Sequence, residues 1–359
     1  MNSIFDHINK SLEQQQPFVC YRKPNDTLLH GQFLKKNTLF YTQDFTEKGF
    51  VFAPFDNSKE AILFPLSESN FFTEKIDYKI LTSIKESEIN LENNFTEQMH
   101  VALVNKGLNV IQNTNLRKIV LSRKETITSD LDIVLAFKKL IHCYKNAFVY
   151  VWFHPEIGLW LGATPETLLK STNQNFETMS LAGTQSFVEH KEVTWGNKEL
   201  EEQQLVTNFI AAQLENITDE INISKTQNLR AGNLLHLKTE VSGKLKLNFN
   251  LKNLIRALHP TPAVCGFPRN EAKDFIIKNE SYTRTFYTGF LGELNFNSQK
   301  TTNKDSHLFV NLRCMEVVDK EVAIFVGGGV TKESNAKKEW LETVAKSKTM
   351  KRVLITKKK

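Results

Sequence analysis

Residues 147–163 read Ala-Phe-Val-Tyr-Val-Trp-Phe-His-Pro-Glu-Ile-Gly-Leu-Trp-Leu-Gly-Ala. Two apolar runs, 147–153 and 158–163, flank the segment His-Pro-Glu-Ile. Short runs that are rich in β-branched and aromatic side chains and bounded by turn residues are typical of β-strands. We therefore predict that the two runs form a pair of strands joined by this short turn.

The segments around this pair mix strands and helices without a regular alternation. Similar runs predict strands over 118–122, 235–241, 286–294, 306–317 and 322–327, and short β elements between residues 18 and 80. Periodic apolar residues predict helices over 4–12, 92–113, 130–144, 197–216 and 335–351. Because strict alternation is absent, a doubly wound parallel sheet is disfavoured and an α+β fold is predicted. We find no Gly- or Pro-rich linker, so we expect one continuous domain with an N-terminal β-rich part, 1–95, and a main region, 96–359.

The composition of the 359 residues excludes several classes of protein. With 40% hydrophobic and 24% charged residues, wholesale disorder is excluded. The net charge of +6 owes much to residues 346–359, which we interpret as a solvated helix end and tail rather than a nucleic-acid-binding face. No apolar run is long enough to span a membrane, and the N-terminus lacks the pattern of a signal peptide. The four cysteines have no zinc-ligand or redox spacing, so we expect a cytoplasmic protein with reduced thiols.

Two Glu-x-x-Glu pairs, Glu199/Glu202 and Glu339/Glu342, lie in predicted helices. Residues at i and i+3 share one face of a helix, so each pair presents two carboxylates in the same direction. If the two helices face each other, four hard oxygen ligands without Cys or His suit Mg²⁺. On spacing alone, two ordinary surface helices with lysine partners such as Lys346 are the simpler interpretation.

Five other segments have both a functional and a structural interpretation. Gly327-Gly-Gly-Val330 either holds an anion at its backbone amides or forms a tight turn after a strand. Thr164-Pro-Glu166 is compatible with the start of a helix. His259 lies in a stiff Pro-rich loop, where a lone histidine is usually structural. Arg313 lies inside a predicted strand, where it pairs with an acid or binds a carboxylate, and Lys118 opens another predicted strand.

The order of these segments along the chain resembles the chorismate-utilising enzyme family. The matching segments are Lys118-Ile-Val-Leu-Ser-Arg123, Gly162-Ala-Thr-Pro-Glu166, Ser180-Leu-Ala-Gly-Thr184, Lys198-Glu-Leu-Glu-Glu202, Leu258-His-Pro-Thr-Pro-Ala263, Arg284-Thr-Phe-Tyr-Thr-Gly289, Leu312-Arg-Cys314, Gly327-Gly-Gly-Val330, and Glu339-Trp-Leu-Glu342 with Lys346. The resemblance covers about residues 118–350, roughly two thirds of the chain, and so many segments in one order make it specific.

The resemblance implies an α+β fold of the aminodeoxychorismate synthase type, a central β-sandwich flanked by helices, together with dependence on Mg²⁺. The implied activity is that of an isochorismate synthase, an isomerase that adds water at C2 of chorismate with loss of the C4 hydroxyl, in menaquinone or siderophore biosynthesis. Ala182 disfavours aminodeoxychorismate synthesis, and Lys118 fits the members that use water rather than ammonia.

Two other functions stay open beside this one. Salicylate synthase, which goes on to eliminate pyruvate, is the alternative within the family. A non-catalytic anion-binding protein on the same fold is the rival of a different class. In either case we expect chorismate as the small-molecule partner, no nucleic acid, no membrane, no glutaminase subunit and a monomeric chain.

The resemblance also implies roles for individual residues. Lys118 is the implied general base on the water, and Glu166 the general acid on the leaving hydroxyl. The implied Mg²⁺ ligands are Glu199, Glu202, Glu339 and Glu342. The residues implied to contact chorismate are Gly183, Thr184, His259, Tyr287, Arg313, Gly328, Gly329 and Lys346. The family pattern is not followed at Gln203, Gly328 and Ala336, none of which is an implied acid, base or metal ligand.

Overall fold

The computed structural model describes residues 3–78, 94–187, 189, 192–232, 234–299 and 305–354. Its strands form two large antiparallel sheets. The first sheet has the order β15 (Gly266–Phe267), β7 (Lys118–Thr128), β19 (Glu321–Thr331), β18 (Cys314–Val318), β9 (Gly158–Thr164), β8 (Phe148–His154), β1 (Phe18–Arg22), β2 (Leu28–Leu34) and β6 (Ser69–Lys75). The second has the order β12 (Thr218–Ile223), β14 (Leu234–Leu245), β11 (Asn175–Ser186), β10 (Thr167–Thr172), β17 (Asp305–Val310), β16 (Phe290–Leu294), β4 (Gly49–Ala53), β5 (Ala61–Pro65) and β3 (Phe40–Thr42), and β13 (Gln227–Ala231) also pairs with β14.

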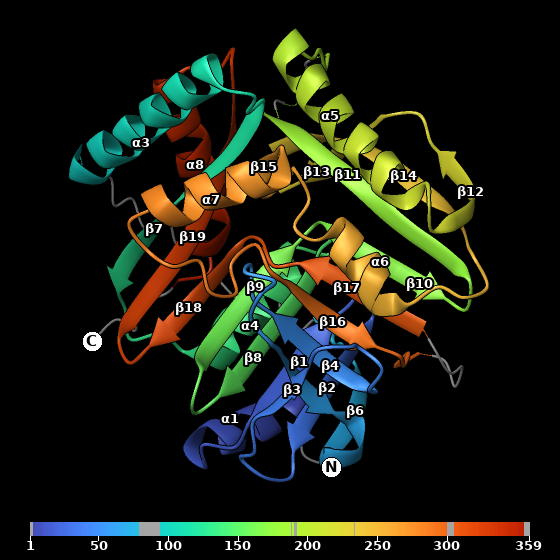
Figure 1. Ribbon diagram of the computed structural model, residues 1–359. Helices are drawn as coiled ribbons and strands as arrows, with labels where there is room; N and C mark the ends of the chain where they lie inside the picture. The colour runs from blue at the N-terminus through green and yellow to red at the C-terminus, as the bar shows by residue number, and fades with distance from the viewer. Residues whose placement is uncertain are drawn as a thin grey trace.

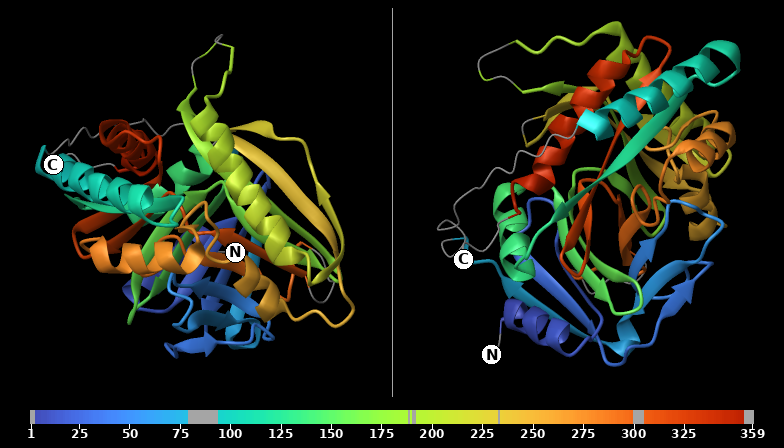
Figure 2. Two further views of the ribbon diagram at one scale, coloured as in Figure 1. Left: turned by 45° about the horizontal axis from the view of Figure 1, so that its top comes forward. Right: turned by 90° about the vertical axis from the view of Figure 1, so that its left-hand side faces the viewer.

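Helices cover the outer sides of both sheets (Figures 1 and 2). In Figure 1, α5 lies across β11 and β14, with α6 beside it. α1 and α4 pack on the first sheet around β1 and β8, whereas α3, α7 and α8 gather around β7 and β19. The helices are α1 (Ile4–Glu13), α3 (Asn94–Asn113), α4 (Ile133–Cys143), α5 (Asn197–Leu214), α6 (Leu251–Leu258), α7 (Arg269–Asn279) and α8 (Ala336–Lys351), and η1 (Leu66–Glu68) is a 3-10 turn.

Aromatic side chains fill much of the space between the two sheets. Along β8, Tyr150 and Trp152 point into this space, where the ring of Trp152 lies 4.9 Å from that of Phe52 on the second sheet. The alternate residues Val149 and Val151 belong to a separate core with α1 and α4. Because successive side chains of a strand point to opposite faces, both faces of β8 are buried and its sequence is continuously apolar. The predicted α+β fold, a β-sandwich flanked by helices, is confirmed.

The predicted strand pair is confirmed, because β8 and β9 pair antiparallel with Trp152 opposite Trp160. The prediction of one strand over 306–317 is wrong. β17 ends at Val310 in the second sheet and β18 begins at Cys314 in the first sheet, so the connection carries the chain across the sandwich. Because both flanking strands are buried and apolar, the sequence pattern does not reveal the break between them. Residues 286–289, also predicted as strand, precede β16.

The first 75 residues contribute strands to both sheets: β1, β2 and β6 to the first, and β3, β4 and β5 to the second. All four cysteines are free thiols. Within the described ranges, we find no helix with the length and apolar character needed to cross a bilayer. Residues 355–359 of the predicted helix end and tail, and the first two residues of the helix predicted over 92–113, lie outside the described residues.

Candidate active site

α5 and α8 bring acidic side chains to one cavity at the edge of the sandwich. Glu202 of α5 and Glu342 of α8 both line it, together with Glu166, Arg313 and Lys346. The sequence predicted all five as site residues although they lie far apart in the chain. The two helices therefore face each other in the way that the Mg²⁺ interpretation of the Glu-x-x-Glu pairs requires.

Glu339, the first acid of the pair on α8, lies beside Glu342. The side chain of Asn335 caps α8, so Glu339 is not needed to cap the helix. Glu339 turns toward β19, where a Cβ added at Gly328 would lie 3.2 Å from its Oε2 and 3.6 Å from Oε1 of Glu342. Burial and the charge of Glu342 raise the pKa of Glu339, as expected for two carboxylates close together.

Glu199, the first acid of the pair on α5, is placed differently. α5 begins after Gly196, which has no side chain to cap the helix. Glu199 is the third helical residue, the position from which a Glu side chain reaches back over the helix start. Its Oε2 lies 2.7 Å from the point where Gly196 would carry a Cβ. The structure thus gathers Glu202, Glu339 and Glu342, named the three-acid cluster below, and leaves Glu199 at the start of its own helix.

A lysine pairs with each member of the three-acid cluster. The Nζ–Oε1 distances are 2.7 Å for Lys118–Glu202, 2.5 Å for Lys198–Glu339 and 2.6 Å for Lys346–Glu342. Lys118 is fully buried at the start of β7, so water does not screen its pair with Glu202. Burial alone would raise the pKa of Glu342, but Lys346, Lys198 and Arg313 outweigh it and lower that pKa.

The glycine run lies inside a strand, so the tight turn, one of the two interpretations considered for it, is wrong. β19 continues to Thr331 and pairs with β7, with Gly328 opposite Leu121. Glycine normally weakens a strand, and the three-acid cluster explains its presence here. A Cβ added at Gly329 would lie 2.3 Å from Oε1 of Glu202 and 3.0 Å from Cε of Lys118. The carboxylates can approach the strand only because these side chains are absent.

The end of β19 also exposes backbone groups along one edge. β18 pairs with β19 only as far as Phe325, so beyond that residue β19 has β7 on one side only. Nζ of Lys346 donates a hydrogen bond to O of Gly327, which shows that Gly327 points its backbone groups away from β7. Because backbone groups alternate along a strand, Gly329 points the same way and Gly328 points toward β7. The geometry favours the amides of Gly327 and Gly329, rather than that of Gly328, as anion donors.

Glu166 lies between two strands. β9 ends at Thr164 and β10 begins at Thr167, so the helix start considered for this segment is wrong. Glu166 is 3% exposed and lines the cavity. Burial raises the pKa of its carboxyl to about 8, although Lys118 and Lys346 act in the opposite direction. With this pKa, the Glu166 carboxyl is protonated in most molecules at neutral pH and is able to act as a general acid.

A bulge in β11 turns Gly183 and Thr184 into the cavity wall. The pairing of β11 with β14 shifts between Ala182 and Gln185, and both bulged residues line the cavity. Bulges re-aim the chain next to functional sites. Gly183 has φ of 70°, a conformation that favours glycine.

His236 of β14 lines the cavity and was missed by the sequence reasoning. Its Nδ1 lies 3.0 Å from O of Gly183, and its Nε2 lies 3.3 Å from Nη2 of Arg313. A guanidinium can only donate, so Nε2 accepts and Nδ1 carries the proton that is donated to Gly183. Burial and the charge of Arg313 lower the pKa of His236 to about 3, which keeps the ring neutral. The only signal in the sequence is one histidine between two leucines of a predicted strand.

Arg313 lies in the connection between the two sheets and not inside a strand, which corrects the prediction. Its φ is 47°, and Thr288, which also lines the cavity, has φ of 60°. Such strained backbone is concentrated at ligand sites. Arg313 donates to O of Lys346 at 3.4 Å and toward His236, so its guanidinium is aimed into the cavity. Tyr287, which precedes Thr288, is buried and lines the same cavity.

His259 is not among the residues that line the cavity. Its Nε2 lies 3.0 Å from O of Thr288, and its ring packs edge-to-face on Phe290 with the centroids 5.1 Å apart. These contacts make His259 a support for the Thr288 loop, which is the structural interpretation considered from the sequence.

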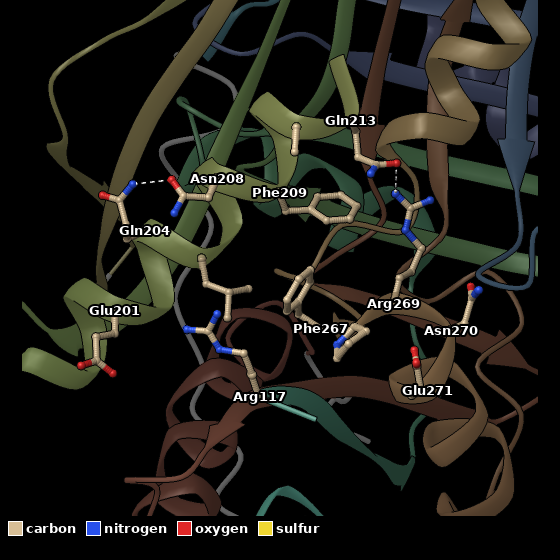
Figure 3. A pocket seen from close by; sticks show the side chains of 13 residues that line it. Arg117, Glu201, Gln204, Asn208, Phe209, Gln213, Phe267, Arg269, Asn270 and Glu271 are labelled. Atoms are coloured by element: carbon tan, nitrogen blue, oxygen red, sulfur yellow. Dashed lines mark hydrogen bonds between the residues drawn. The ribbon is translucent and has the colours of Figure 1, made fainter. Parts of the chain in front are cut away.

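A larger hollow, of about 680 Å³, borders a different side of α5 (Figure 3). Phe209 and Phe267 are part of its lining, and the guanidinium of Arg269 stacks 4.6 Å from the Phe209 ring. The residues predicted for the site do not line it. The cavity at Glu166 has only about 70 Å³, but Glu166, Glu202 and Glu342 all line it, whereas Lys118, Glu199 and Glu339 are not among its lining residues. We therefore take the smaller cavity as the candidate active site.

This fold and this arrangement of acids and lysines define a class of enzyme. The model of the family described as "Chorismate binding enzyme" matches residues 57–355. The chain belongs to this family, so the resemblance of its ordered segments is confirmed.

Several relatives are isochorismate synthases by name. Isochorismate synthase EntC from Escherichia coli K12 is 31% identical over 246 residues, which are 65% of this chain and 61% of EntC. The structure of DhbC from Bacillus anthracis matches with a TM-score of 0.78 and 25% identity, over 96% of this chain and 98% of that one. MenF, the menaquinone-specific isochorismate synthase of Escherichia coli, matches with a TM-score of 0.77 and 20% identity, over 94% and 89% of the two chains. The chain thus spans about three fifths of EntC.

Proposed function

We propose that this chain is an isochorismate synthase, which converts chorismate into isochorismate. The observation that carries the proposal is the buried Glu166, whose pKa burial raises to about 8, in a cavity lined also by Glu202, the ion-pair partner of Lys118. Lys118, in its neutral amine form, would take a proton from water as the oxygen bonds to C2, the double bonds would shift, and Glu166 would give its proton to the C4 hydroxyl as it leaves. One water molecule is added at C2 and one leaves from C4, so the product has the same atoms as chorismate, as an isomerisation requires. The names of the relatives EntC and MenF support this reaction.

Chorismate carries two carboxylates, and the cavity offers a separate region for each of them. The enolpyruvyl carboxylate would meet Arg313, Lys346, Tyr287 and the amide of Gly329. The ring carboxylate would lie toward the three-acid cluster and the bulge at Gly183 and Thr184. Binding at two ends fixes the ring between acid and base, which is the positioning that proton transfer needs.

The three-acid cluster has the chemistry of a Mg²⁺ site. Its groups are carboxylates, which Mg²⁺ prefers, and Oε2 of Glu339 is buried with no hydrogen-bond partner among the described residues. Glu202, Glu339 and Glu342 would hold the ion, and Glu199 would act through water. The ion would supply positive charge that anchors the ring carboxylate of chorismate.

The product assay tests the proposed function. Purified protein, chorismate and Mg²⁺ should give isochorismate, separated from chorismate by liquid chromatography. Salicylate with an equal amount of pyruvate would instead support the salicylate synthase alternative. If chorismate binds but is not consumed, the catalytic proposal fails and the anion-binding protein takes its place.

Removing divalent cations should abolish turnover, and Mg²⁺ should restore it. In Glu342→Gln, we expect the Mg²⁺ concentration for half-maximal rate to rise roughly 10- to 100-fold, because a ligand charge is lost. Initial rates across a Mg²⁺ titration measure this value. The exposed Glu333→Gln, just before α8, is the matched control and should leave it unchanged. Full activity in excess EDTA would contradict the metal proposal.

Gly329→Ala should inactivate the enzyme although it adds only a methyl group. The methyl carbon would overlap Oε1 of Glu202 and press on Lys118, so both must move. We expect a loss of about 100-fold or more in kcat/KM, since small displacements of catalytic groups are costly. Gly107→Ala is the control, because its Cβ meets only the end of a flexible Leu121 side chain. Near-normal activity of Gly329→Ala would contradict the requirement for close packing of Glu202 and Lys118 against this strand.

Three further properties rest on the sequence and stay predictions. We propose a cytoplasmic, monomeric enzyme without a glutaminase subunit. The division of the chain at residue 95 is likewise a prediction, made from the order of the expected strands and helices.

A further inference from the structure

Lys198 is the one lysine of the site whose function the proposed mechanism leaves open. It lies in the first turn of α5, and its Nζ reaches across to Oε1 of Glu339 on α8 at 2.5 Å. The Glu339 side chain is 2% exposed, whereas that of Lys198 is 22% exposed. One end of this ion pair is therefore fixed in the protein, and the other is a flexible cation that can turn toward solvent.

The charges of all three members of the three-acid cluster act on the ammonium of Lys198. Glu339 is its contact, and Glu202 and Glu342 also act on it and help to raise its pKa. Glu202 and Glu342 each have a lysine of their own, Lys118 and Lys346. Glu339 has Lys198 as its partner, and its other oxygen, Oε2, is buried without a hydrogen-bond partner among the described residues.

We propose that Lys198 is a built-in competitor for the divalent cation: its ammonium occupies the three-acid cluster when no metal is bound and must leave Glu339 when a metal binds. Three acids pressed together would repel one another without a cation, and the ammonium prevents this at the cost of weaker metal binding. The inference rests on the proposed metal site, but not on turnover of chorismate.

Metal binding without substrate tests this inference. Binding of Mn²⁺ alone, followed by the loss of the free-ion signal in electron paramagnetic resonance, should be about tenfold tighter in Lys198→Met than in the wild type. Lys198→Arg, which keeps a cation at this position, should not show the gain. Lys338→Met removes one charge from an exposed position next to Glu339 on α8, and it corrects for the general effect of net charge.

A second measurement uses the unaltered protein and does not depend on how the variants fold. Lys198 should react faster with acetic anhydride when Mg²⁺ is present, because the displaced amine is more accessible, whereas Lys338 should react at the same rate. Peptide mass spectrometry measures both rates.

Two results would overturn the inference. One is an affinity of Lys198→Met for Mn²⁺ equal to or weaker than that of the wild type. The other is reactivity of Lys198 that is unchanged or reduced by Mg²⁺. If the wild type makes isochorismate but shows either result, only this inference fails. If Lys198→Met binds Mn²⁺ more tightly but the wild type does not consume chorismate, the proposed function fails and this inference stands.

Discussion

Replacement of Lys118 by alanine should lower the rate of isochorismate formation by about 10²- to 10⁴-fold, the usual contribution of a general base. Lys118 is fully buried, and its Nζ lies 2.7 Å from Glu202 at the wall of the cavity that holds Glu166. We find no other lysine among the described residues that is both fully buried and paired with the three-acid cluster. Steady-state rates with saturating chorismate and Mg²⁺ measure the loss.

The loss must be separated from structural damage, because Lys118 also contacts Glu202. Lys118→Gln keeps a hydrogen-bond donor toward Glu202 but cannot take a proton, so it should lose as much activity as the alanine variant. Lys124→Gln, at an exposed position of the same strand, should keep normal activity. Both Lys118 variants should still bind chorismate and Mg²⁺. Near-normal turnover in Lys118→Gln would reject the base assignment.

The sequence predicted the parts of the fold in which burial and side-chain pattern agree. The strands at 147–163 are apolar on both faces because helices cover one face and the second sheet covers the other. β11 was missed because its inward-facing residues include Thr178 and Ser180, which are polar. Thr178 donates to O of Leu168, and Ser180 pairs with Thr207, so hydrogen bonds replace the apolar pattern that sequence reasoning looks for.

In the site, Gln203 is another residue whose buried hydrogen bonds the sequence pattern does not reveal. It departs from the family pattern directly after Glu202, but its side chain is buried and points toward β11 and β14. Its Nε2 lies 2.8 Å from Oγ of Ser180 and 3.0 Å from Oγ1 of Thr239. Gln203 therefore fastens α5 to β11 and β14, which fixes the rotation of the helix that presents Glu202.

The two Glu-x-x-Glu pairs look equivalent in the sequence, but their helix starts make them different. Glu339 lies in the first turn of a helix whose N-cap is Asn335, whereas Glu199 lies in the first turn of a helix whose N-cap is Gly196, which offers no capping side chain. The free helix start draws Glu199 back, since a carboxylate near a helix N-terminus is favourable. Sequence spacing predicts which residues share a helix face. It does not predict whether the Glu199 carboxylate lies at the start of its own helix or joins the three-acid cluster, because that depends on the three-dimensional arrangement.

Activity should fall as the pH rises above about 8, because Glu166 then loses the proton that it must donate. Burial raises the pKa of its carboxyl from 4.5 to about 8. The pH dependence of kcat/KM reports groups of the free enzyme, so its basic limb should have an apparent pKa near 8. Glu166→Gln should lower the rate about 10²- to 10⁴-fold at every pH and should lack this limb.

Glu166 should also affect the free energy of unfolding, which can be measured without catalysis. A carboxyl whose pKa is raised in the folded state favours folding below its unfolded value of 4.5, and this advantage is lost as the pH rises to about 8. Relative to Glu166→Gln, the wild type should therefore lose up to about 5 kcal/mol of unfolding free energy across this window. Urea unfolding of both proteins between pH 5 and about 8 measures the difference. A constant difference across the window would show that Glu166 is ionised throughout, and the general-acid assignment would fail with it.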